Sequence, residues 1–157
     1  MANIELDKID RKIINLLQRD SQITNLELAD AVAVSPPTCL RRVRRLRDAG
    51  VITRDVSLVD PDKLGSHIQL IVNVELKSDD RIQMDAFEKT IHAQDCVMQC
   101  YLVTGTTDYV LVVCLRNMSE FERFARMTLY ANPLVNRFFT LTVISRVKYE
   151  TRIPVDN

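Results

Sequence analysis

Apolar residues recur at three- and four-residue intervals near the start of the chain, which is the spacing of one face of a helix. This pattern runs from Asp7 to Arg19, and Asp7 can cap the helix that it predicts. A second, shorter apolar pattern follows Thr24 and Glu27, which form a Thr-x-x-Glu capping box. Two helices are therefore predicted before residue 33.

A third helix is expected after Ala33-Val34, where the periodicity is interrupted. Ser35 is a favoured N-cap, and Pro36 suits the first helical position because its missing N–H would have no partner there. We expect this helix to run to Ala49 and to close with Gly50 in the left-handed conformation. Two short helices about a tight turn predict a helix-turn-helix, whose second helix lies in the DNA major groove.

The second of these helices, the expected recognition helix, has an apolar face and an arginine-rich face. Leu40, Val43 and Leu46 align toward the core, with Cys39 beside them. From residue 38 to residue 54, six arginines stand against one acid. A solvated surface helix is the alternative, but like charges at this spacing repel, and an arginine fork grips phosphate or guanine with two hydrogen bonds. The residues expected to contact double-stranded DNA are Ser35, Pro37, Thr38, Arg41, Arg42, Arg44, Arg45 and Arg54.

The second half of the chain alternates apolar and polar residues, which is typical of strands. Helices interrupt this alternation after Asp80, which is followed by Gln83, and after Ser119, which forms a capping box with Glu122. The order is β-α-β-β-α-β, that of the ferredoxin-like fold. The predicted strands span residues 68–77, 97–104, 109–115 and 135–148.

The domain boundaries follow from a turn-rich segment over residues 60–65. The residues before it, 51–59, are strand-like and predict a wing after the recognition helix. The chain is therefore expected to be an α+β protein, with a winged helix-turn-helix domain before a ferredoxin-like domain. The expected organisation is residues 1–54 as the helix-turn-helix DNA-binding domain, 55–66 as a linker and 67–157 as the ferredoxin-like domain.

Several predicted strands are apolar on both sides, notably 109–115 and 138–144. Because both helices of a ferredoxin-like domain cover one face of its sheet, the other face would expose a large apolar surface, which is unusual for a monomer. We therefore expect a second subunit to cover it. A dimer would also pair two recognition helices, matching two-fold symmetric operators.

Composition and charge argue against a membrane protein, a secreted protein and an enzyme. The net charge is zero and the pI about 6.7, so attraction to DNA must come from the local arginine patch. The longest apolar run, residues 109–115, is far too short to span a membrane, and no secretion signal is present, which predicts a cytoplasmic protein. The cysteines are expected to be small buried hydrophobes. The two histidines, His67 and His92, are far apart in the sequence and lack a nucleophile or metal-ligand partner. No catalytic residues, metal site or cofactor are expected.

In this order and length, the two predicted domains resemble the Lrp/AsnC (feast/famine) transcription regulators. The resemblance covers nearly the whole chain, and the helix with Cys39 and the Arg-Arg-Leu run is similar to the leucine-responsive branch in particular. It implies a transcription regulator that forms homodimers and octamers and binds an amino-acid effector, for which leucine or methionine is expected. It also implies that residues 67–157 serve ligand sensing and oligomerisation. It rests on residues 6–13, 35–46, 50–52 and 102–109.

The resemblance also implies that the Gly-x-x-Asp-Tyr loop lines a ligand site between dimers. A glycine turn with threonines can present N–H groups and hydroxyls to a ligand carboxylate, and Asp108 offers a carboxylate to an ammonium. The alternative is that Gly105 and Asp108 simply form a hairpin turn. The residues expected to bind the ligand are Met98, Tyr101, Thr104, Gly105, Thr106, Thr107, Asp108 and Tyr109, with Thr140 and Thr142 from a neighbouring subunit.

Two rival functions remain. Haem-pathway decarboxylases resemble this family and share its two-domain layout, but a tetrapyrrole pocket would recruit basic or histidine side chains, whereas here the arginines concentrate on the recognition helix. The other rival is an amino-acid-binding module whose helix-turn-helix no longer binds DNA. Salt-sensitive retention on DNA or heparin distinguishes this module from a regulator.

Overall fold

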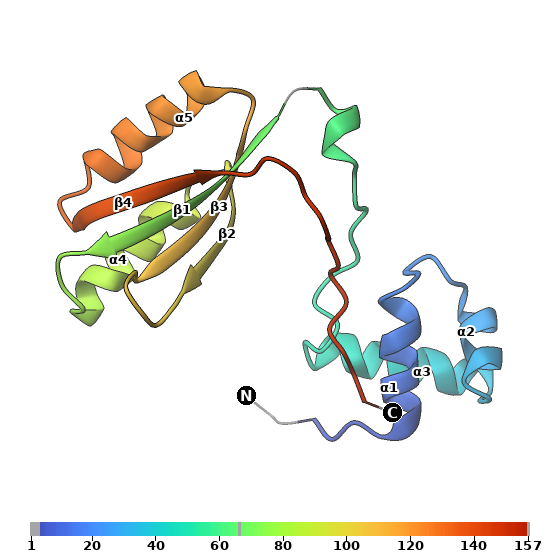
Figure 1. The fold of residues 1–157 in the computed structure, drawn as a ribbon. Helices are drawn as coiled ribbons and strands as arrows, with labels where there is room; N and C mark the ends of the chain where they lie inside the picture. Colours follow the sequence, from blue (N-terminus) through green and yellow to red (C-terminus); the bar gives the residue numbers. More distant parts are fainter. Residues whose placement is uncertain (1–3, 66, 157) are drawn as a thin grey trace. The chain divides into compact units, whose positions relative to one another are not determined.

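The computed structural model describes residues 4–65 and 67–156, which divide into two compact units (Figure 1). One unit contains the residues up to Leu58 together with those from Lys148 onward, and the other contains residues 59–147. The end of the chain thus packs with the helical unit, whereas the sequence pattern predicts that it belongs with the sheet. No helix within the described ranges is long and apolar enough to span a bilayer.

The helical unit contains α1 (Lys8–Leu17), α2 (Asn25–Ala31) and α3 (Pro36–Asp48), as predicted. Capping boxes open the first two helices: Asp7 pairs reciprocally with Asp10, and Thr24 with Glu27. Each box satisfies backbone N–H groups that the first turn of a helix leaves without partners. The caps therefore determine where these helices begin.

Helix α3 begins and ends as predicted, with Pro36 in its first turn and Gly50 at φ 72°. The Ser35 hydroxyl, however, donates to the Thr38 hydroxyl at 2.9 Å and caps no backbone N–H.

The prediction that Leu40 belongs to the buried stripe is wrong, because this residue is 39% exposed whereas Cys39 is fully buried. The buried residues Cys39, Val43 and Leu46 are four and three positions apart and span about 60° of the helix circumference, whereas the two three-residue steps from Leu40 to Leu46 span about 120°.

The predicted strand over residues 51–59 does not form. Instead, the backbone N–H groups of Val51 and Ile52 donate to the Leu46 carbonyl at 2.9 and 3.2 Å, and their side chains pack on the helical core. The residues that follow, 53–59, are exposed and form no strand ladder within the described chain. A strand-like composition produces a strand only where a neighbouring strand supplies hydrogen bonds.

The sheet unit has the predicted β-α-β-β-α-β order. Its described residues form a four-stranded antiparallel sheet in the order β2-β3-β1-β4. Its elements are β1 (Ile68–Leu76), α4 (Arg81–His92), β2 (Val97–Leu102), β3 (Tyr109–Leu115), α5 (Met118–Phe124), a π-helical segment (Ala125–Tyr130) and β4 (Val135–Thr142). The fold class predicted from the sequence is therefore confirmed.

Two boundaries in this unit differ from the prediction. Helix α5 is capped by Asn117, whose side chain accepts the Glu120 N–H at 3.0 Å, and not by Ser119. Strand β4 ends at Thr142 and does not reach residue 148. It ends there because its partner β1 begins at Ile68, so the residues after 143 have no neighbouring strand.

The two faces of the sheet have different environments. Helices α4 and α5 pack on one face, and the β1 side chains that point to it, such as Val72, are fully buried (Figure 1). The open face carries Tyr101, Phe139 and Leu141, each more than half exposed. The strand pairing places Val110, together with Tyr101 and Phe139, in one row across this face. The predicted exposed apolar face is therefore present.

Candidate nucleic-acid interface and ligand site

The outward face of α3 carries cationic side chains. Arg41 and Arg44 are exposed, and neither forms an ion pair within the part of the chain that the structure describes. Arg54, beyond the helix end, is also exposed. Ser35 and Pro37 are exposed at the start of the helix, where Thr38 is half-buried. Unpaired guanidinium groups on an accessible helix face suit the phosphates and guanine edges of DNA.

The other two predicted DNA-contacting arginines of α3 have partners in the α1 region. The Arg42 Nη1 atom lies 2.7 Å from an Asp7 oxygen and 2.8 Å from an Asp10 oxygen. Arg45 also pairs with Asp10, whose side chain is completely buried. The sequence-based prediction weighed only acids within the same helix, and these carboxylates lie more than 30 positions earlier in the chain.

These ion pairs shift the pKa values of the groups that form them. The pKa of Asp7 is lowered to about 2, first because it accepts the Asp10 backbone N–H and then because Arg42 donates to it. The carboxylates of Asp7 and Asp10 raise the pKa of Arg42. The side chain of Arg42 is only 23% exposed, whereas that of Arg45 is 47% exposed. Arg42 therefore orients α3 on α1, while Arg45 remains accessible at the surface.

The β2–β3 hairpin contains the predicted ligand loop. Gly105 has φ 133°, a conformation that favours glycine, and it is exposed together with Thr104 and Thr106. The Thr107 hydroxyl donates to the Val74 carbonyl at 2.8 Å, and an Asp108 carboxylate oxygen accepts the Leu76 N–H at 2.7 Å. The loop is thus anchored on the end of β1, and Asp108 has a structural contact whatever else it binds.

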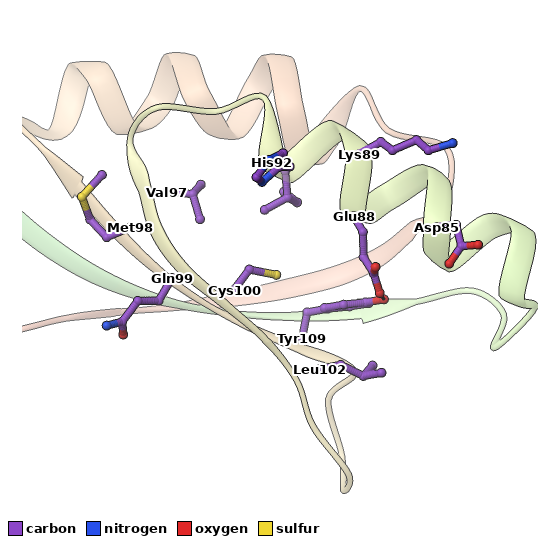
Figure 2. Close-up of a pocket in the computed structure, with 11 residues that line it drawn as sticks. Asp85, Glu88, Lys89, His92, Val97, Met98, Gln99, Cys100, Leu102 and Tyr109 are labelled. Carbon is purple, nitrogen blue, oxygen red and sulfur yellow. Dashed lines mark hydrogen bonds between the residues drawn. The ribbon is translucent and has the colours of Figure 1, made fainter. Parts of the chain in front are cut away.

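A cavity of about 710 Å³ lies between α4 and β2 (Figure 2). Its helical wall includes Glu88 and His92, and Cys100 lies on the strand wall. The Tyr109 hydroxyl donates to Glu88 Oε1 at 2.8 Å, and burial together with this carboxylate raises the pKa of Tyr109. Of the predicted ligand residues, only Met98 and Tyr109 line this cavity.

The remaining predicted ligand residues lie elsewhere on the unit. Tyr101 is on the open sheet face, opposite Val110 in the strand pairing. Thr140 pairs with the buried Val72, and its hydroxyl is buried without a hydrogen-bond partner in the described chain. Thr142 is exposed at the end of β4. One protomer therefore does not bring the loop, Tyr101 and the two threonines into a single site.

Sequence reasoning missed two residues of these sites, Asp10 and Glu88. Asp10 already forms part of a capping box, so nothing in its local sequence indicates a second role. Glu88 belongs to the polar face of α4, a pattern that a solvated helix also has. Their partners come from distant segments, which the order of residues along the chain does not reveal.

The cysteines agree only in part with the expectation of buried hydrophobes. All four are free thiols, but only Cys39 is buried, while Cys100 is exposed. Cys96 and Cys114 are half-buried. No group of three or more histidine, cysteine or acidic residues that could hold a metal ion occurs within residues 4–65 and 67–156.

Comparisons with known proteins match both units. The model described as Lrp/AsnC ligand binding domain matches residues 69–153, and the one described as winged helix-turn-helix DNA-binding matches residues 6–53. The chain is 39% identical to an uncharacterised HTH-type transcriptional regulator of Sinorhizobium fredii over 153 residues, covering 98% of this chain and 90% of the relative. It is 34% identical to the leucine-responsive regulatory protein of Escherichia coli over 151 residues, covering 96% of this chain and 92% of that one.

A solved structure agrees along nearly the whole chain. The crystal structure of a Neisseria meningitidis transcriptional regulator in complex with L-methionine has a TM-score of 0.88 and 31% sequence identity, covering 97% of this chain and 98% of that one. The helix-turn-helix, the antiparallel sheet and both family matches thus agree in order and extent. The chain belongs to the Lrp/AsnC family of transcription regulators.

Proposed function

We propose that this protein is a sequence-specific DNA-binding transcription regulator whose assembly or DNA binding responds to a small amino acid. The observation that carries the proposal is the exposed arginine pair Arg41 and Arg44 on α3, a helix that the buried Asp10 holds in place through two other arginines. Double-stranded DNA is the partner, and the cytoplasm is the compartment in which a bacterial regulator meets it.

The residues of α3 divide into two roles. Arg41, Arg44 and the nearby Arg54 contact phosphates or guanine edges in the major groove. Arg42 acts as a positioning residue because its guanidinium is committed to Asp7 and Asp10. Arg45 can serve both roles, since nearly half of its side chain is exposed.

The effector belongs to the sheet unit, which matches the ligand-binding model of the family. Leucine or methionine is the proposed effector, supported by a relative named for its response to leucine and by a similar regulator solved with L-methionine. Because the candidate ligand residues lie on separate surfaces of one protomer, we propose that the site is completed between subunits. The assembly is a homodimer that forms octamers, in which the open sheet face is covered.

The regulation follows from linked equilibria. An amino acid can change assembly or DNA affinity only if it binds one arrangement of subunits more tightly than another. A ligand held between subunits meets this requirement, because the two halves of its site separate when the arrangement changes.

The DNA-binding proposal is tested by titrating a selected genomic fragment with Arg41→Ala and Arg44→Ala at several salt concentrations. Each variant should bind about 10-fold more weakly, or worse, and the slope of log affinity against log salt should fall by about 0.9 for each phosphate that the variant no longer binds. Arg81→Ala is the control, because this exposed arginine lies on α4 and pairs with Asp85. Parental affinity in both α3 variants would refute the assigned DNA surface.

The effector proposal is tested by calorimetry with L-leucine and L-methionine. Asp108→Asn removes the charge that would bind the ammonium, yet it keeps a side-chain oxygen that can accept the Leu76 N–H. Binding should weaken at least 10-fold, and the exposed Asp79 provides a matched control, Asp79→Asn. Unchanged heats in Asp108→Asn would remove this residue from the site.

A further inference from the structure

The end of the chain lies extended along α1, within the helical unit. The side-chain amide of Gln18 accepts the Ile153 N–H at 2.7 Å and donates to the Ile153 carbonyl at 3.0 Å. Asn15 donates to the Val155 carbonyl at 3.0 Å, and Arg11 extends the series to residue 156. Three side chains along one helix thus bind successive parts of one extended main chain.

The spacing of these side chains explains the arrangement. Arg11, Asn15 and Gln18 are four and three positions apart, so they lie on one face of α1 and its C-cap. The two bonds between Gln18 and Ile153 reproduce the pair that opposed residues exchange in an antiparallel ladder. These hydrogen bonds are all to the main chain, and Val155 adds a side chain that packs against the helical core. The surface therefore fits an extended peptide.

We propose that this face of α1 is a docking surface for an extended main chain, and that its occupant, residues 150–156, acts as a strap that ties the DNA-binding unit to the end of β4. The linker after Leu58 already joins the helical unit to the sheet unit. The strap adds a second connection, because residues 143–149 lead from β4 to the docked segment. Motion of β4 then reaches α1 directly as well as through the linker.

Two features favour docking in the intact chain. Contacts within the docked strap restrict its conformation, since the Arg152 guanidinium pairs with Glu150 at 2.7 Å and the Arg152 N–H donates to the same carboxylate at 3.1 Å. This pairing also lowers the pKa of Glu150 to about 2. In addition, the strap belongs to the same chain as α1, so its docking is intramolecular and weak contacts suffice.

The docking surface is tested by NMR titration of a chain that ends at Tyr149 with a synthetic peptide of residues 150–156. The peptide should shift the side-chain amide signals of Asn15 and Gln18, and it should bind the full-length chain at least 10-fold more weakly because that site is occupied. Gln18→Met in the shortened chain should weaken peptide binding about 10-fold, whereas Gln22→Met, at an exposed glutamine of the same unit, should not. A peptide with an N-methyl group on Ile153 should also bind about 10-fold more weakly.

The strap itself is tested in the full-length chain by comparing the rotational correlation times of amides in α2 and in β3. Gln18→Met should make α2 tumble measurably faster relative to β3 than it does in the parent. Failure of the peptide to bind, equal binding by the two methionine variants, or unchanged tumbling in Gln18→Met would overturn the proposal. None of these readouts requires DNA or an effector, so they remain decisive if the proposed function fails.

Discussion

The Asp10 carboxylate is the residue on which the geometry of the helical unit depends most. It is fully buried, it belongs to the capping box of α1, and it binds Arg42 and Arg45 of α3. Burial of a charge is costly unless hydrogen bonds compensate it. Removal of Asp10 therefore affects both the stability of the unit and the orientation of the helix that meets DNA.

Asp10→Asn should lower the free energy of unfolding by about 2 kcal/mol, within the range for a hydrogen bond to a charged group. It should also weaken DNA binding, since Arg42 and Arg45 lose the group that orients them. Urea unfolding and gel-shift titration measure the two effects. Asp30→Asn, at an exposed position of α2, is the control, and equal stability of both variants would contradict the prediction.

The neighbouring Asp7 makes a prediction about pH. Its pKa is lowered from 3.8 to about 2, so its contribution to stability is present above pH 4 and is lost as the pH falls toward 2. The difference in unfolding free energy between the parent and Asp7→Asn should therefore be constant near neutral pH and shrink between about pH 5 and pH 2. Urea unfolding across this range measures it, and a difference that grows on acidification would show that the sign is wrong.

At the level of elements, hydrogen bonds at the ends decide boundaries more than the composition inside does. Helices α1, α2 and α4 begin where a capping side chain precedes them. Helix α5 is capped by Asn117, whose side chain accepts the Glu120 N–H, and not by Ser119, the cap that the sequence pattern predicts. Residues 51–59 and 143–148 show the converse, since strand-like sequences without a neighbouring strand form no strand.

The choice of cap in α5 is testable with a matched pair of substitutions. Asn117→Ala should lower the free energy of unfolding by about 1 kcal/mol, because it leaves a backbone N–H of the first turn without a partner. Ser119→Ala lies inside the helix and should change stability by less than about 0.5 kcal/mol. Thermal and urea unfolding measure both, and a larger loss in Ser119→Ala would restore the cap predicted from the sequence.

At the level of the whole molecule, the open face of the sheet indicates assembly. Tyr101, Phe139 and Leu141 expose apolar surface there, and Arg137 lies over the Phe139 ring with its guanidinium carbon 5.4 Å from the centroid. The opposite face is covered by α4 and α5. A second subunit would bury the open face, as expected from strands that are apolar on both of their sides.

Phe139→Glu should therefore prevent the proposed dimer from forming, because assembly would bury an unpaired charge. Sedimentation velocity should show a smaller species at micromolar concentration, with the secondary structure retained by circular dichroism. Ile82→Glu is the control, since Ile82 is 80% exposed and lies on α4, away from the open face. An unchanged assembly in Phe139→Glu would exclude the open face as the subunit interface.

The order of elements, the capped starts of α1, α2 and α4 and the two-domain organisation could be predicted from the sequence, because they depend on periodicity and on contacts a few residues apart. The turn glycines Gly50 and Gly105 belong to this group, since their positive φ angles are local requirements. So does the outward placement of Arg41 and Arg44, which the helical period determines.

Only the tertiary structure decided which charged groups have partners and which segments find a neighbour. Asp10 binds Arg42 and Arg45, Glu88 accepts the Tyr109 hydroxyl, and Gln18 holds Ile153 across 135 positions of sequence. Such contacts form between groups that folding brings together, and periodicity along the chain carries no information about them. For the same physical reason, a strand-like sequence became a strand only where another strand came to lie beside it.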